Sequence, residues 1–189
     1  MTAQKRHTKG FTLVELLIVA VVLAIFAAIV IPQFASTTDE ARDSALRSDL
    51  AAMRSAIELY RQQHGEYPGA NAATGGTCTG GTAGTGAAES AAAFFEQLAF
   101  YSNDSGQTCT RPVGGAFPYG PYIRETAMPA NTVSGSSTVV LVGAADAAAG
   151  DLAMSGDAAN GGWKFDVTSG KFIANDTSTD ATGTRYDSY

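Results

Sequence analysis

Histidine and cysteine are scarce in this sequence, and that scarcity excludes most catalytic and metal-binding chemistry. The 189 residues include two histidines and two cysteines, with no C-x-x-C pair and no histidine near either cysteine. A zinc site therefore has no ligand set. After residue 10 the only histidine is His64, so a serine or cysteine nucleophile has no evident general base, and no Gly-x-Ser-x-Gly sequence occurs. We expect a protein that is not an enzyme.

Phosphate-binding features are missing as well. The glycine-rich residues 69–93 contain no G-x-x-x-x-G-K-[ST] sequence, so they do not form a nucleotide cradle. The net charge is −6, and beyond the basic first ten residues nine basic side chains face 18 acidic ones, a net charge of −9. Nucleic-acid affinity comes largely from lysine and arginine neutralising phosphates. We therefore expect no nucleic-acid partner.

One long apolar run dominates what is present. Residues 11–31 contain a single charge, Glu15, and as a helix they would extend about 31 Å, enough to cross the hydrocarbon core of a bilayer. Lys5, Arg6 and Lys9 precede the run and favour a cytoplasmic N-terminus, with the rest of the chain outside. A secretory signal peptide has a shorter apolar region. An ordinary membrane anchor fits the length and stays open as an alternative.

Glu15 is the residue that an ordinary anchor does not need. An acid inside an apolar span costs about 2.5–3.5 kcal/mol at mid-helix and less near the end, and it requires a partner. If the chain is cut between Gly10 and Phe11, the new amino group of Phe11 supplies a cation. A neighbouring subunit's Glu15 would approach that amine, satisfying both charges and fixing the stagger between helices.

Gly10 followed by FTLVELLIVAVVLAI resembles the processing signal of type IV pilins and type II secretion pseudopilins. The resemblance implies that a prepilin peptidase cuts after Gly10 and methylates Phe11, and that Glu15 acts in subunit assembly. It also places Pro32 where the helix of this family commonly bends. Proline has its own reason to kink a helix, because it lacks a backbone donor and clashes with the carbonyl four residues earlier.

Beyond Pro32 the sequence returns to a helical pattern and then changes character. An apolar stripe runs at steps of four and three, and Gly65 and Pro68 end the helix; the stripe is Leu46, Leu50, Met53, Ile57 and Tyr60. A short helix around Phe94 follows, then a strand at 138–142 and a hairpin at 162–174. We expect an α+β, pilin-like fold in which a long kinked N-terminal helix packs on a small antiparallel sheet.

Cys78 and Cys109 lie 31 positions apart in a region of glycine, alanine and threonine that has little to bury. A location outside the cytoplasm favours a disulfide over two free thiols. We expect residues 69–93 to form a flexible loop tied at Cys78. Closing a loop of this length contributes about 3–4 kcal/mol in the chain-entropy model.

The resemblance also implies a calcium ion in a C-terminal loop. Carboxylates suit calcium, but no fixed ligand spacing is recognisable, so solubilising acids are the favoured interpretation and no ligand is assigned. The aspartates concerned are Asp146, Asp151, Asp157, Asp166, Asp176 and Asp180. We expect no other cofactor.

The predicted organisation has four parts: a leader peptide (1–10), a transmembrane and assembly helix (11–31), its amphipathic continuation (32–65) and a globular head (66–189). The resemblance implies an inner-membrane subunit that polymerises with copies of itself into a pilus or pseudopilus, with a prepilin peptidase and an assembly platform as partners. Two alternatives remain: a minor or initiating pilin, and a membrane-anchored extracytoplasmic binding module that uses the signal only for delivery.

Overall fold

The computed structural model describes residues 10–157 and 161–189, without the side chains of residues 31–36. It contains two compact units, Met1–Ala41 and Arg42–Tyr189. The helix α1 (Leu13–His64) has residues in both. The predicted leader lies outside the described residues apart from Gly10. Helical backbone continues through Pro32, but the side chain of Pro32 is not among those described, so the kink stays a prediction.

The second unit is built on the C-terminal half of α1. The predicted apolar stripe is confirmed, because all five of its side chains are at most 4% exposed. The helix ends where Gly65 takes a positive φ of 78° and donates its N–H to the carbonyl of Arg61 at 2.8 Å. This is the left-handed glycine cap expected from the sequence, since glycine adopts that conformation without a Cβ penalty.

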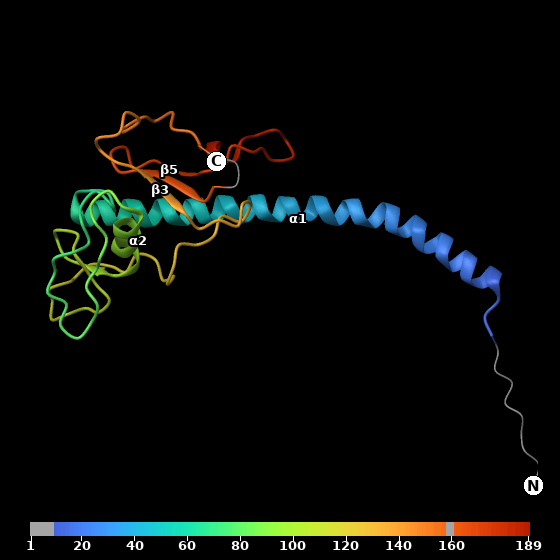
Figure 1. Cartoon of the computed structure of the whole chain (residues 1–189), viewed down its shortest axis with the longest axis horizontal. Coiled ribbons are helices and arrows are strands. Elements are labelled where there is room, and N and C mark those ends of the chain that lie inside the picture. Colours follow the sequence, from blue (N-terminus) through green and yellow to red (C-terminus); the bar gives the residue numbers. More distant parts are fainter. Residues whose placement is uncertain (1–9, 158–160) are drawn as a thin grey trace, which may run out of the picture. The chain divides into compact units, whose positions relative to one another are not determined.

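A three-stranded sheet packs against this helix (Figure 1). Its strands are β3 (Val139–Val142), β4 (Trp163–Asp166) and β5 (Phe172–Ala174), in the order β3-β4-β5. The predicted hairpin is confirmed, with β4 and β5 antiparallel. The prediction of a wholly antiparallel sheet was wrong for β3, which pairs parallel with β4. A parallel pair needs a crossover of a dozen or more residues, and the connection over residues 143–162 provides one.

Aromatic rings fill the space between the sheet and α1. The rings of Trp163 and Phe172 lie 5.3 Å apart, and Phe94 lies 4.8 Å from Phe165. Trp163 is fully buried, and its indole N–H donates to the carbonyl of Pro129 at 2.8 Å, so its polar atom is also satisfied. These rings join α1, the short helix α2 (Ala91–Ala99) and the sheet into one core. The predicted α+β class is confirmed.

Polar contacts hold the last residues of the chain against α1 and the sheet. Tyr186 begins the 3-10 helix η1 (Tyr186–Ser188) and donates its hydroxyl to Asp43 at 2.9 Å. Arg54 donates to the main-chain oxygens of Phe172 and Tyr189, and the guanidinium of Arg47 lies 4.2 Å from the centre of the Tyr189 ring. Arg47 and Arg54 on α1 therefore both contact the chain's own C-terminal segment.

The glycine-rich segment has little apolar burial, and hydrogen bonds hold it in place. The strands β1 (Tyr101–Ser102) and β2 (Thr108–Cys109) pair antiparallel, and Gly84 donates its N–H to the carbonyl of Thr108 at 3.0 Å. Glu96 on α2 accepts the backbone N–H groups of Thr85 and Gly86. The segment was predicted to be a flexible loop, but specific contacts order its backbone.

Gln97 is the centre of this hydrogen-bonded region. Its side chain is fully buried on α2. Its Oε1 accepts the N–H of Gly69 at 2.6 Å, and its Nε2 donates to the carbonyls of Asn71 and Gly106 at 3.0 and 2.9 Å. One amide therefore satisfies three backbone groups, two in the turn region after α1 and one in the loop between β1 and β2.

Replacing Gln97 by Leu should lower the free energy of unfolding by about 2–4 kcal/mol, because buried polar groups lose their partners. Urea unfolding followed by the fluorescence of Trp163, the only tryptophan, measures the change. The exposed Gln62 on α1 is the matched control, and Gln62→Leu should leave the midpoint nearly unchanged. Equal midpoints for the two variants would refute the role given to Gln97.

The structure joins Cys78 to Cys109 by a disulfide. Because the cross-link restricts the unfolded chain over a separation of 31 residues, we expect the double variant Cys78→Ala, Cys109→Ala to lose about 3–4 kcal/mol of unfolding free energy. Adding a reductant should shift the urea midpoint of the native chain to that of the double variant, and should not shift the variant itself. An unchanged midpoint after reduction would show that the cross-link contributes no stability.

Candidate assembly site

The N-terminus of α1 carries a reciprocal pair of hydrogen bonds. Thr12 precedes the first helical residue, and its Oγ1 accepts the backbone N–H of Glu15 at 3.2 Å. The carboxylate of Glu15 reaches back and accepts both the N–H and the hydroxyl of Thr12 at 2.8 Å. This is a capping box, in which the first and fourth residues satisfy each other's free donors. The signal was present in the sequence as T-L-V-E, and the sequence interpretation missed it.

The capping box changes the interpretation of Glu15. Its carboxylate already has partners within its own chain, and a negative charge is favoured at the positive end of a helix. The acid is therefore accommodated within the single chain. Gly10, Phe11, Thr12 and Glu15 surround one shallow hollow of about 420 Å³. The predicted cleavage, methylation and assembly residues are thus brought together at one end of α1.

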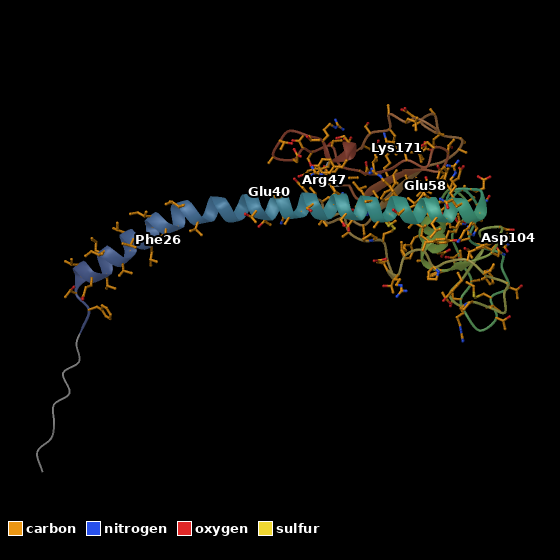
Figure 2. The ribbon with its side chains drawn as sticks, turned by 180° about the vertical axis from the view of Figure 1, so that it is seen from behind. Phe26, Glu40, Arg47, Glu58, Asp104 and Lys171 are labelled. Atoms are coloured by element: carbon orange, nitrogen blue, oxygen red, sulfur yellow. A yellow bond between two sulfur atoms is a disulfide. The ribbon has the colours of Figure 1, made fainter. Side chains whose placement is uncertain are left out.

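The surface beyond this end of the helix is apolar and uncovered. The segment Leu13–Val30 has a mean hydropathy of 3.1, and none of it is buried within the described part of the chain. It is the one described helix long and apolar enough to cross a membrane. Figure 2 shows side chains such as Phe26 standing out from the ribbon, and Phe26 is 61% exposed. Soluble monomers rarely expose apolar surface on this scale, so the segment requires lipid or protein around it.

Most of the aspartates considered for calcium accept hydrogen bonds or form an ion pair within the chain. Asp166 accepts two backbone N–H groups and the hydroxyl of Ser169. Hydroxyls of Tyr189 and Thr182 donate to Asp180 and hold the pKa of that carboxyl well below its usual range. Asp157 forms an ion pair with Lys164 at 2.7 Å.

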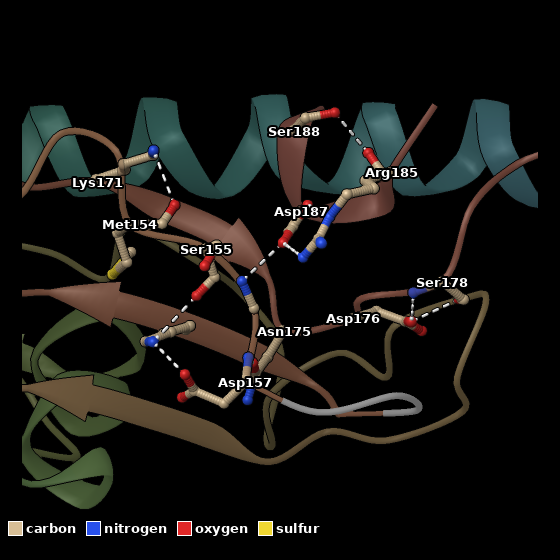
Figure 3. A network of polar contacts seen from close by, with 12 residues as sticks. Met154, Ser155, Asp157, Lys171, Asn175, Asp176, Ser178, Arg185, Asp187 and Ser188 are labelled. Atoms are coloured by element: carbon tan, nitrogen blue, oxygen red, sulfur yellow. Dashed lines mark hydrogen bonds and ion pairs between the residues drawn. The ribbon is translucent and has the colours of Figure 1, made fainter. Parts of the chain in front are cut away.

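The carboxylates considered for calcium are not grouped together among the described residues. Asp176 has a buried Oδ2 without a hydrogen-bond partner, but its Oδ1 is held by Ser178 (Figure 3). Calcium takes six to eight oxygen ligands. Among the residues that the structure describes, no three His, Cys, Asp or Glu side chains are grouped so that they could hold a metal ion. Solubilising acids stay the favoured interpretation of these aspartates, and calcium binding is untested.

Comparison with known proteins finds a known family motif at the start of the chain. Residues 5–31 match the family model described as "Prokaryotic N-terminal methylation motif". The first segment of this protein carries that motif. The match includes Gly10, Phe11 and Glu15, the three residues grouped at the end of α1.

Curated relatives extend the match to about a third of the chain. The type II secretion system core protein G of Pseudomonas aeruginosa is 38% identical over 65 residues, which is 34% of this chain and 46% of the relative. The core protein G of Aeromonas hydrophila is 35% identical over 65 residues, with the same coverage. The fimbrial protein of Neisseria meningitidis is 39% identical over 67 residues, 35% of this chain and 39% of the relative.

The chain therefore spans less than half the length of these relatives. The recognition of a pilin and pseudopilin likeness is confirmed over the matched part. No solved structure matches the chain.

The capping box predicts a specific effect of removing one hydroxyl. Thr12→Val should speed amide hydrogen exchange at Glu15 and Leu16 by about two- to thirtyfold in detergent micelles, because an N-cap contributes about 0.5–2 kcal/mol. Thr12→Ser keeps the hydroxyl and should retain slow exchange. If valine and serine gave the same rates, the Thr12 hydroxyl would not be stabilising the helix end.

Proposed function

We propose that this chain is a structural subunit of a type IV pilus-like or type II secretion pseudopilus filament, cut between Gly10 and Phe11 and assembled through α1. The observation that carries the proposal is the match of residues 5–31 to the N-terminal methylation motif, which includes Glu15 at the start of an uncovered apolar helix. A simple anchor needs only the apolar helix. Glu15 is useful when a second charge must be met at a defined position.

The proposed assembly replaces lipid contacts by helix contacts. Lipid tails are as apolar as leucine, so transfer of Leu13–Val30 from the bilayer to a bundle of copies gains packing and polar contacts, with little hydrophobic energy. The free amine of Phe11 in one subunit and Glu15 in the next form the polar contact of this bundle. Separating these two charges in the low-dielectric core of the bundle costs free energy. The pair therefore fixes the axial position of each helix relative to the next.

The proposed location follows from the same segment. Before assembly the subunit is anchored in the inner membrane by α1, with the head outside the cytoplasm. Two features support this orientation: basic residues precede the apolar run, and the head contains the Cys78–Cys109 disulfide, which persists in oxidising compartments. A prepilin peptidase and an assembly platform are the partners that the proposal requires. The subunit acts by assembly, with no catalytic step.

Glu15→Ala tests the assembly role. The variant should be inserted and processed normally, but its filament yield should fall more than tenfold. Removing one partner of a buried ion pair leaves the other uncompensated at a cost of about 3–5 kcal/mol. Yield is measured by shearing filaments from the native host and immunoblotting the sheared and membrane fractions.

Glu40→Ala is the matched control, since Glu40 is an exposed acid on the same helix beyond the apolar segment. It should assemble at the native level. A native filament yield from Glu15→Ala would contradict the register role of Glu15. A native chain that reaches the membrane but never copurifies with a filament would favour the anchored binding module.

A further inference from the structure

His64 occupies the last position of α1 and is enclosed by aromatic side chains. Its ring stacks on Tyr60 with the centroids 3.9 Å apart and an interplanar angle of 4°. The rings of Tyr119 and Tyr122 approach edge-on, with centroids at 4.9 and 6.2 Å. The imidazole is half-buried, and it is the only histidine in residues 11–189.

Both ring nitrogens have partners that suit one neutral form of the ring. Nδ1 lies 3.0 Å from the carbonyl oxygen of Tyr60, which can only accept, so Nδ1 carries the proton. Nε2 lies 3.0 Å from the hydroxyl of Ser102, a fully buried side chain. In the neutral ring Nε2 is an acceptor, and the serine hydroxyl donates to it.

These contacts join separate segments of the head. Ser102 belongs to β1, and its backbone exchanges two hydrogen bonds with Tyr119, at 3.0 and 3.1 Å. Tyr122 donates its hydroxyl to Gln63 on α1 at 2.6 Å. We call the contacts of His64 with Ser102, Tyr119 and Tyr122 the His64 junction. It holds β1 and the segment around Tyr119 to the last turn of α1, the end of the helix near Asp104 in Figure 2.

The groups around the ring set its response to acid. Burial lowers the pKa of His64, while backbone hydrogen bonds to Tyr60 and Asn103 and the charge of Asp104 oppose that shift. Burial raises the pKa of Tyr122 to about 12 and that of Tyr60 further, and the hydrogen bond to Asp104 raises the pKa of Tyr119. The three tyrosines therefore stay protonated from pH 5 to 8, and across that range His64 is the ring that changes charge.

We propose that the His64 junction is a pH-sensitive latch, closed while the imidazole is neutral and opened when the imidazole takes up a proton. In the open state the ring is solvated and titrates near its ordinary pKa of about 6.5, whereas in the closed state it binds the proton less readily. The open state therefore binds more protons, so closure is fully favoured above about pH 6.5. As the pH falls through that value the open population rises, by at most about tenfold per pH unit, and it levels off below the closed-state pKa.

The test is amide hydrogen exchange of the full chain in detergent micelles at pH 7.5, 6.5 and 5.5, corrected for intrinsic rates. The reporters are the backbone N–H groups of Ser102 and Tyr119, each of which donates to the carbonyl of the other residue beside the ring. Their protection should fall several-fold between pH 6.5 and 5.5. The amide of Asp166, bonded to the carbonyl of Lys171 in the β4–β5 hairpin, should stay constant. Constant protection of Ser102 and Tyr119 over the whole range would overturn the latch.

His64→Gln removes the titrating ring, so the ratio of protection between the two pH values should become one, whatever the absolute protection. Asp104→Asn is the control that keeps the ring, and the pH dependence should persist. The same acid response in His64→Gln as in the native chain would assign it to another group. If His64→Gln does not fold, nitrogen-15 spectra of the native imidazole decide the matter. The proton must sit on Nδ1 at pH 7.5, and a proton on Nε2 would overturn the proposal.

Discussion

The need to cover one apolar helix surface determines how this protein can exist. From Leu13 to Val30 the chain offers a membrane-length face that none of its described residues covers. Water is excluded as its environment because each exposed apolar side chain there would cost free energy. In the function proposed here, lipid before assembly and other copies after assembly are the two environments that satisfy it. The capping box lets Glu15 enter either environment with its carboxylate already bonded to Thr12.

The head has few apolar residues with which to build a core. Its core is one layer of aromatic rings between α1 and a three-stranded sheet, and much of the remaining chain has little to bury. Polar contacts and one cross-link therefore support the organisation. Gln97 joins the turn region after α1 to the β1–β2 loop, Arg54 binds main-chain oxygens of two segments, and the disulfide closes the glycine-rich region. Polar contacts of this kind are specific in geometry but sensitive to charge state and redox conditions.

Local patterns in the sequence predicted the local features of the fold. The stripe from Leu46 to Tyr60 and the β4–β5 hairpin depend on spacing between neighbours, and the structure confirms both. Other features depend on residues far apart in the chain. They are the parallel pairing of β3 with β4, the hydrogen bond of Gln97 with Gly69, and the contact of Arg54 with Tyr189. No local period encodes such contacts. The capping box of Thr12 and Glu15 was local and could have been found, because T-x-x-E before an apolar run is a recognised N-terminal pattern.

The most direct test of the account is the intact mass and N-terminal sequence of the protein extracted from the membrane of its native host. The account predicts the loss of residues 1–10 and a methyl group on the amine of Phe11. That result would supply the cation that Glu15 is proposed to meet. A chain that keeps Met1, in a host whose prepilin peptidase cuts a control substrate, would leave a simple anchor and contradict the assembly mechanism.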